Sequence, residues 1–252
     1  MSHFNSWKPA QSRRFWLALL AALSLVLPAA TALAHQPFFE DGDLTPATPL
    51  RVADPLVSTA LYATLDRPGD VDYFVFDGQA GQRVEVGVTI PQIEGQEDFA
   101  PTVGLIGPGL PELAGVALPD KETRQLAKTG DGLLVLGPVP ATTFFEPFSR
   151  TSYWRRQREK VTLPADGQYT LVVWSPDNTV GRYVLVVGDR EVPGGDLMFP
   201  MKLPVYWTPV TSGESASDGA KPPIQQPTPT PCTWLERLLD RFSGSSRSRC
   251  AF

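Results

Sequence analysis

The side chains that most often carry catalysis are scarce in this chain of 252 residues. It contains two histidines and two cysteines, and His3 falls inside an expected export signal. With His35 as the other histidine, a Ser-His-Asp triad in a folded core and a zinc motif built on two histidines are both excluded. The sequence also contains no G-x-S-x-G, no phosphate-binding P-loop and no C-x-x-C. We therefore expect a protein that is not an enzyme and has no catalytic residues.

Carboxylates are the remaining groups that could do chemistry. A glycoside hydrolase needs two of them about 5–9.5 Å apart, one on each side of the scissile bond. The 27 acidic residues of this chain are spread over many segments, and nothing in their spacing selects a pair. A glycoside-type hydrolase is therefore a distant alternative.

The two cysteines, Cys232 and Cys250, lie close together near the C-terminal end. An exported chain meets an oxidising compartment, which favours a disulfide. An internal bridge would close the tail on itself, and an inter-chain bridge is the alternative. No histidine accompanies either cysteine, so neither is expected to be a nucleophile.

The N-terminal segment, residues 1–34, has the pattern of a signal peptide. Arg13 and Arg14 precede an apolar run over residues 15–27, and Ala32-Leu33-Ala34 offers small residues for cleavage. We expect cleavage after Ala34 and an extracytoplasmic destination: periplasmic, secreted or on the cell surface. An uncleaved membrane anchor is the alternative, and both general secretion and twin-arginine export stay open.

Composition favours an all-β protein. The chain has 26 prolines and 21 glycines, with few long segments of helical period, so turns and short strands should dominate. Its net charge of −5 argues against a nucleic-acid partner, because phosphate binding needs a basic face.

The stretch from Asp66 to Ile90 is the clearest structural signal. Pro68-Gly69 suits the centre of a type II turn, and two apolar runs follow, over residues 71–76 and 84–90. A short loop joins the two runs, so they are expected to pair as a β-hairpin. Further strands are expected at residues 58–65, 103–106, 114–118, 133–136, 161–163, 169–174 and 183–187, with a polar connection over 121–129.

These strands predict an antiparallel β-sandwich or jelly roll over residues 35–192. A Pro/Ser/Gly-rich linker is expected over residues 193–231. Residues 232–252 form the tail, where a T-x-x-E capping box opens a short amphipathic helix. Its apolar stripe is predicted to dock on a membrane surface, on another protein or on this same chain, and consists of Trp234, Leu235, Leu238, Leu239 and Phe242.

Residues 142–154 hold an unusual concentration of aromatic side chains around an arginine. Aromatic faces with an arginine suit a binding surface for a sugar or a peptide. A loop that folds over the sandwich and buries its own aromatics is the alternative. The residues predicted for the surface are Phe145, Phe148, Arg150, Tyr153 and Trp154.

Three short motifs resemble the bacterial pre-peptidase C-terminal domain and its collagen-binding relatives. They are Gly69-Asp-Val-Asp-Tyr-Phe74, Ala80-Gly81-Gln82 and Ala165-Asp-Gly-Gln-Tyr-Thr-Leu171. The resemblance implies a secreted jelly-roll module without catalytic residues over about residues 40–189, with 119–158 as an insertion. This chain departs from the family's usual context, because no peptidase domain is attached.

The same resemblance implies a calcium site, because some members bind calcium through an acidic lead-in and the first aspartate-rich turn. Oxygen ligands are what this hard cation prefers. Aspartates that merely cap turns in solvent are the alternative, and no other cofactor is implied. The positions that match are Glu40, Asp41, Asp43, Asp70 and Asp72.

The sequence as a whole predicts an exported, non-catalytic β-sandwich binding module for a protein or glycan ligand. A structural or accessory subunit of a cell-envelope complex, docking through the tail, is the alternative.

Overall fold

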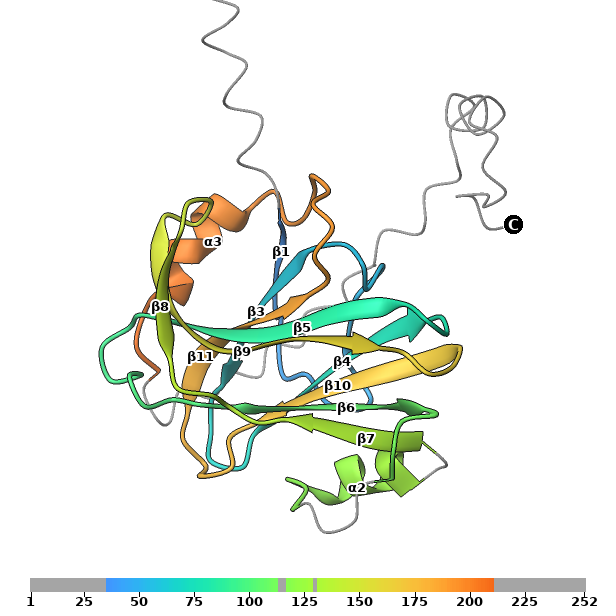
Figure 1. The fold of residues 1–252 in the computed structure, drawn as a ribbon. Helices are drawn as coiled ribbons and strands as arrows, with labels where there is room; N and C mark the ends of the chain where they lie inside the picture. The colour runs from blue at the N-terminus through green and yellow to red at the C-terminus, as the bar shows by residue number, and fades with distance from the viewer. Residues whose placement is uncertain (1–34, 113–116, 129–130, 211–252) are drawn as a thin grey trace, which may run out of the picture. The chain divides into compact units, whose positions relative to one another are not determined.

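A computed structural model describes residues 35–112, 117–128 and 131–210. By compactness the chain divides into two units, Met1–Ser215 and Ala216–Phe252, and all described residues belong to the first. The described part is an all-β sandwich of two packed sheets (Figure 1). Its elements are β1 (Gln36–Phe39), β2 (Leu50–Arg51), β3 (Thr59–Leu65), β4 (Val71–Gly78), β5 (Arg83–Pro91), β6 (Thr102–Pro108), α2 (Lys121–Lys128), β7 (Asp131–Leu136), β8 (Thr142–Glu146), β9 (Thr151–Thr162), β10 (Gly167–Trp174), β11 (Gly181–Val187) and α3 (Phe199–Tyr206).

One sheet has six strands in the order β1-β3-β11-β5-β9-β8, and the other has five in the order β2-β4-β10-β6-β7. Most pairs are antiparallel, as expected. The two N-terminal strands differ, because β1 runs parallel to β3 and β2 runs parallel to β4. The lead-in before β3 therefore adds one edge strand to each sheet and is more ordered than its irregular sequence predicts.

The predicted hairpin of residues 71–76 and 84–90 is wrong, although both strands exist. β4 pairs with β2 and β10, whereas β5 lies in the other sheet between β11 and β9. Phe74 and Phe76 of β4 and Val86 and Val88 of β5 all belong to the core between the sheets. Each run has one apolar face, and the two faces bury against each other across the sandwich instead of lying side by side in one sheet.

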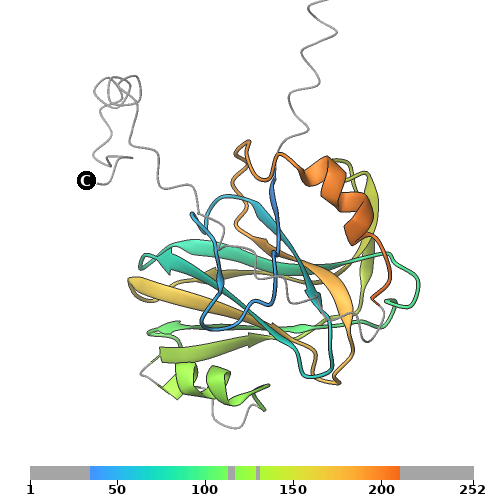
Figure 2. The same cartoon turned by 180° about the vertical axis from the view of Figure 1, so that it is seen from behind.

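The outer face of each sheet carries a helix (Figure 2). Each helix also takes part in a smaller apolar cluster on that face. Helix α2 covers the five-stranded sheet near β7, where the sequence predicts only a polar connection. Asp120 accepts a hydrogen bond from the Thr123 backbone N–H at 2.7 Å and so caps this helix, a signal that the sequence prediction missed. The strand expected at 114–118 falls mostly outside the described residues, and 117–118 are not extended strand.

Helix α3 lies within the segment predicted as a linker from residue 193. Phe199 and Tyr206 are buried against Tyr62 and Tyr153 on the outer face of the six-stranded sheet. The Tyr206 hydroxyl also donates to the Ala63 carbonyl oxygen at 2.9 Å. The aromatic residues between the prolines thus fix this segment to the sandwich, and ordered chain continues past the predicted boundary at Val192. No helix in the described ranges is long and apolar enough to cross a membrane.

Candidate functional site

A tight turn before β4 brings two aspartates to one end of the sandwich. Gly69 has φ of 79°, and the Asp70 N–H donates to the Arg67 carbonyl oxygen at 3.1 Å. This is the turn that Pro68-Gly69 predicts, with the positive φ at the glycine. It ends at Asp70, and Asp72 follows two residues later within β4.

Asp72 faces the interior between the two sheets. Because side chains alternate along a strand, it shares its face of β4 with Phe74, which belongs to the core. Only 1% of Asp72 is exposed, and its carboxylate accepts a hydrogen bond from the Tyr183 hydroxyl of β11 at 2.6 Å. A carboxylate is therefore held inside the sandwich at the end of its core.

Asp70 is also buried, with 5% of its surface exposed. Its carboxylate accepts hydrogen bonds from the Asp66 N–H at 2.9 Å and the Val71 N–H at 3.0 Å. The Arg67 guanidinium lies 3.1 Å away on the solvent side. The turn thus fixes the position of Asp70 through its own backbone.

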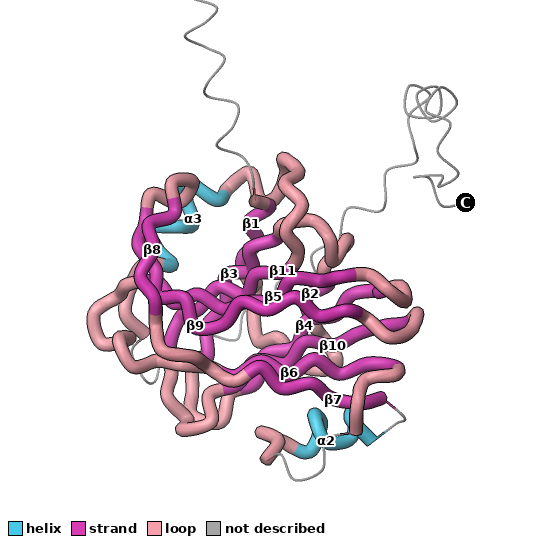
Figure 3. The backbone as a smooth tube through the Cα atoms, in the orientation of Figure 1, coloured by secondary structure: helices cyan, strands magenta, loops and turns pink. Residues whose placement is uncertain are grey.

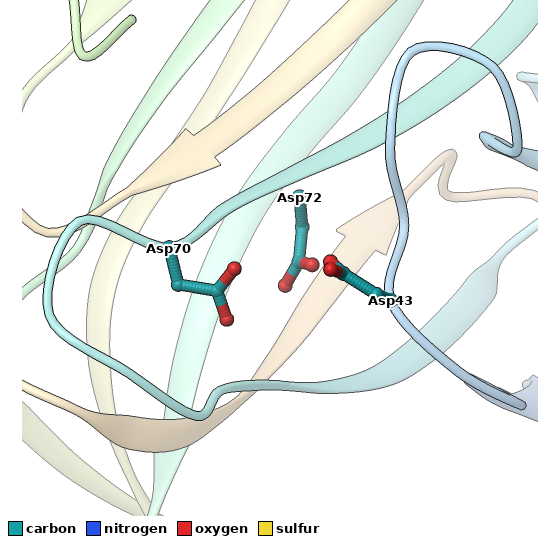
Figure 4. A group of neighbouring side chains, drawn as sticks. All are labelled: Asp43, Asp70 and Asp72. Atoms are coloured by element: carbon teal, nitrogen blue, oxygen red, sulfur yellow. The ribbon is translucent and has the colours of Figure 1, made fainter. Parts of the chain in front are cut away.

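The third carboxylate, Asp43, comes from the loop between β1 and β2. The next residue, Leu44, is buried, and its carbonyl oxygen accepts a hydrogen bond from the Tyr73 N–H at 2.8 Å. This attachment to β4 brings the exposed Asp43 beside the two buried aspartates. One carboxylate oxygen from each of Asp43, Asp70 and Asp72 lies within 4.8 Å of the others (Figure 4).

One arginine provides the ion pairs of this acidic group. Arg67 contacts the carboxylates of Asp43 at 2.7 Å, Asp66 at 2.9 Å and Asp70 at 3.1 Å. Asp72 has no ion pair among the described residues and relies on Tyr183. The negative charge of the group is therefore only partly balanced.

Burial raises the pKa values of the two inner aspartates. For Asp70, burial is the main cause and the pKa rises to about 6. Burial and the neighbouring charge of Asp70 also hold the pKa of Asp72 well above its usual range, against the hydrogen bond from Tyr183. Desolvation and like-charge repulsion both disfavour the charged form of a carboxyl group.

Glu40 borders the same group at the end of β1. Burial raises the pKa of its carboxyl group well above the usual range, and the charge of Asp72 adds to the rise. A hydrogen bond with Thr64 acts in the opposite direction. Glu40 thus belongs to the electrostatic environment of the three aspartates.

Of the five positions that the resemblance suggests for calcium, the structure groups Asp43, Asp70 and Asp72, with Glu40 next to them. Asp41 is exposed and is not a member of the group. The sequence prediction missed Arg67 and Tyr183. Arg67 lies inside the predicted turn, so its charge was a usable signal, whereas Tyr183 is more than a hundred residues away and only the folded chain brings it to Asp72.

Close carboxylates with raised pKa values have two ways to relieve their repulsion. They can take up protons, or they can share a cation that is coordinated by their oxygens. Three carboxylates from two segments suit a hard divalent ion better than a soft one, because all their ligand atoms are oxygens. This arrangement is the candidate metal site of the protein.

The predicted aromatic binding surface is not a single surface. Residues 142–162 form the hairpin β8–β9 rather than a loop. Phe145 is 60% exposed, but Tyr153 is buried and Phe148 stacks on Phe199 of α3 with ring centroids 4.9 Å apart. Trp154 packs against the core between the sheets, and Arg150 is an exposed turn residue with φ of 54°. The alternative of self-buried aromatics therefore describes most of this cluster.

A groove of about 740 Å³ lies beside β9, and no sequence pattern predicted it. Leu134 and Leu136 of β7 form one wall, and β9 from Arg155 to Thr162 forms the other. Gln157 bridges the two sheets there, donating to the carbonyl oxygens of Pro101 at 2.6 Å and Leu136 at 3.3 Å. Its amide oxygen has no donor among the described residues.

A smaller cleft on the outer face of the six-stranded sheet is lined by His35, Tyr62, Glu85, Phe144 and Arg155 among others. A third lies at the turns that hold Asp54, Asp77 and Asp166. Neither these two clefts nor the groove includes Asp43, Asp70 or Asp72 in its lining.

Several predicted features lie outside the described residues. They are the export signal over 1–34, the tail stripe from Trp234 to Phe242 and the cysteines Cys232 and Cys250. The disulfide and the docking function of the tail therefore stay predictions.

Comparisons with known proteins give weak likenesses. No family model matches the chain, and no curated protein matches it. Among solved structures, the pre-peptidase C-terminal domain of a collagenase from Bacillus anthracis is 11% identical, with a TM-score of 0.29 over 54% of this chain and 90% of that one. PliG from Aeromonas hydrophila, a periplasmic inhibitor of g-type lysozyme, is 12% identical, with a TM-score of 0.28 over 62% and 98%. Both likenesses are at the level of the fold alone, and the strand pairing described above defines the architecture.

Proposed function

We propose that this protein is an exported, non-catalytic β-sandwich binding module whose lead-in segment is fixed by a calcium ion at Asp43, Asp70 and Asp72. The observation that carries the proposal is the convergence of these three carboxylates, two of them buried, with one arginine to balance them. A cation there would join the segment between β1 and β2 to the start of β4. It would act as a cross-link, in the way that bound metals add to folding stability.

The donor set fits calcium. This ion takes six to eight oxygen ligands, including carboxylates, backbone carbonyls and water, and tolerates irregular geometry. Asp70 and Asp72 are preplaced by the turn and by Tyr183, so little side-chain freedom would be lost on binding. Arg67 contacts Asp43 and Asp70 from the solvent side, and an arriving ion would displace or reposition it.

The proposal of a non-catalytic role rests on where the perturbed carboxylates lie. Carboxyl groups with raised pKa values commonly mark catalytic sites when they face a cleft. Here the groove beside β9 and the two clefts described with it are lined by other residues. A substrate bound in any of them would not meet Asp70 or Asp72, which favours a structural ion. The ligand of the module would be a protein or a glycan, and export follows from the predicted signal over residues 1–34.

Isothermal titration calorimetry with calcium tests this proposal. Because a pKa of about 6 leaves part of the Asp70 carboxyl group protonated at pH 6, and that proton must leave for a cation to bind, binding at pH 6 should release protons that two buffers of different ionisation enthalpy reveal. The variant Asp70→Asn with Asp72→Asn should lose the heat of binding. Asp41→Asn, which changes an exposed carboxylate outside the group, is the matched control and should bind as the parent chain does. Equal binding by the double variant would overturn the proposal.

A further inference from the structure

The free edge of β9 is the unexplained feature of the groove. β8 pairs with residues 151–155 of β9, and β5 pairs with the opposite edge along the length of the strand. The part from Gln157 to Thr162 therefore has a strand on one side only. Figure 3 shows β9 continuing beyond β8 toward the end of the sheet.

The hydrogen-bond pattern identifies which backbone groups point into the groove. Leu163 donates to the Gln82 carbonyl oxygen at 2.9 Å and accepts from the Gly81 N–H at 2.8 Å, so its N–H and C=O face the β5 side. In an antiparallel pair, successive residues direct these groups to opposite edges. The backbone groups of Arg158, Lys160 and Thr162 consequently face away from β5.

The charged side chains of this edge are drawn away from it. Sheet edges are commonly protected by charged residues, lysine above all. Here Arg158 contacts Glu85 of β5 at 2.7 Å, and Lys160 contacts Asp189 beyond β11 at 2.5 Å. Both side chains are thus tied back across the outer face of the sheet, leaving the backbone edge open beside the groove.

The two walls of the groove differ in chemistry. On the inner side, Leu134, Leu136 and Val161 line it with apolar surface. On the outer side, Arg155 lies over the Phe144 ring at 4.3 Å and has no carboxylate within ion-pair distance among the described residues. Arg158 and Lys160 are already paired with carboxylates, so Arg155 is the basic group of this wall that an acidic side chain could pair with.

We propose that the edge of β9 at Arg158, Lys160 and Thr162 binds an extended peptide segment with alternating apolar and acidic residues, which adds a strand to the six-stranded sheet. This proposal rests on the proposed binding function and names its ligand class. Backbone pairing supplies affinity in such strand addition, and alternate side chains supply specificity. The apolar side chains would face Leu134 and Val161, and an acidic side chain on the opposite face would reach Arg155, whose guanidinium suits a carboxylate.

The probe is a blocked heptapeptide of alternating valine and glutamate, with the valine–lysine peptide as its control. The peptide is titrated into the ¹⁵N-labelled exported chain, and the amide signals of the protein are followed by NMR. The amide signals of Arg158, Lys160 and Thr162 should shift saturably, because their N–H groups gain partners. The valine–lysine peptide should bind at least tenfold more weakly.

Two pairs of variants distinguish the contribution of backbone hydrogen bonds to peptide binding from the contribution of charge. Lys160→Pro removes the outward N–H and should weaken binding at least tenfold, whereas Lys160→Ala keeps that N–H and should change it less than twofold. Arg155→Ala should weaken binding severalfold, and Arg83→Ala, an exposed change at the start of β5, should not. If Lys160→Pro does not fold, the shift map and the two peptides decide the question without it.

Three results would overturn the proposal. They are no shift at millimolar peptide, shifts that map away from residues 157–162, or equal binding of both peptides. Shifts of the same amides that depend on protein concentration without peptide would assign the edge to a second copy of the chain instead. Calcium calorimetry on the same sample reports the ion site independently, so a failed peptide titration with intact calcium binding would remove the edge site and leave the ion site standing.

Discussion

Aspartates in two regions of this sandwich respond in opposite directions to their surroundings. At the start of β4, burial raises the pKa of Asp70 to about 6 and that of Asp72 well above its usual range. In the turn after β10, hydrogen bonds from Ser175 and Thr179 lower the pKa of the largely exposed Asp177. In the first region, burial disfavours the charged form of the carboxyl groups. In the second region, hydrogen-bond donors stabilise the charged form.

The comparison distinguishes Asp177, whose carboxylate stabilises a turn, from Asp72, whose carboxylate lacks a positively charged partner among the described residues. Asp177 is explained by its own turn, since the Ser175 hydroxyl donates to its carboxylate at 2.6 Å and the Thr179 hydroxyl at 3.0 Å. Asp72 has one donor, Tyr183, and carboxylates as its other charged neighbours. A protein that needed only a turn at β4 would gain stability from an uncharged residue at position 72.

The substitution Asp72→Asn gives the largest effect expected from this comparison. In a chelator at pH 8, it should raise the free energy of unfolding by about 1 kcal/mol or more, because it removes a buried charge and keeps an acceptor for Tyr183. At pH 4, where the aspartate itself is protonated, the gain should vanish. Chemical denaturation at both pH values measures it, and a loss of stability at pH 8 would show that the charged carboxylate is already well accommodated.

The substitution Asp177→Ala should have the smaller and opposite effect. Losing the hydrogen bonds from Ser175 and Thr179 should cost about 0.5–1 kcal/mol at pH 7, since the residue is largely exposed. A lowered pKa means that this contribution is present above the unfolded pKa near 4 and is lost as the pH falls through the folded value. Denaturation at pH 7 and pH 3 checks both statements. If Asp177→Ala instead increased stability at pH 7, the charge of Asp177 would be unfavourable, as it is for the aspartates at the start of β4.

The sequence was sufficient for features that depend on local chemistry. Pro68-Gly69 defined the turn before β4, and alternating apolar residues located most strands of the sandwich. The pairing of those strands could not be predicted from the apolar pattern. β4 and β5 would have the same pattern whether they were neighbours in one sheet or faced each other across the core. Helix α3 was missed for a related reason, since its prolines suggested a linker while Phe199 and Tyr206 gain their burial only from the folded sheet.

In the acidic group too, some features could be predicted from local sequence and others depend on contacts between distant segments. The aspartates and their connection through the lead-in were suggested by motif resemblance. The structure brings Asp43, Asp70 and Asp72 together, and calcium binding by them stays a prediction. The sequence did not provide Tyr183, which reaches Asp72 from the opposite sheet, nor the groove beside β9. Contacts between distant segments decide both features, and no local pattern encodes them.

The most direct test of the central claim is the free energy of unfolding from pH 4 to pH 8, in calcium and in chelator. A raised pKa means that the stability contributed by Asp70 is complete below its unfolded pKa near 4 and is lost as the pH rises through about 6. The chain in chelator should therefore lose stability over this range. Calcium should restore it, with an increment that grows with pH to about 2.7 kcal/mol at a hundred times Kd. An increment that is absent at millimolar calcium, or that persists in Asp70→Asn with Asp72→Asn, would contradict the claim that these aspartates form a cation site.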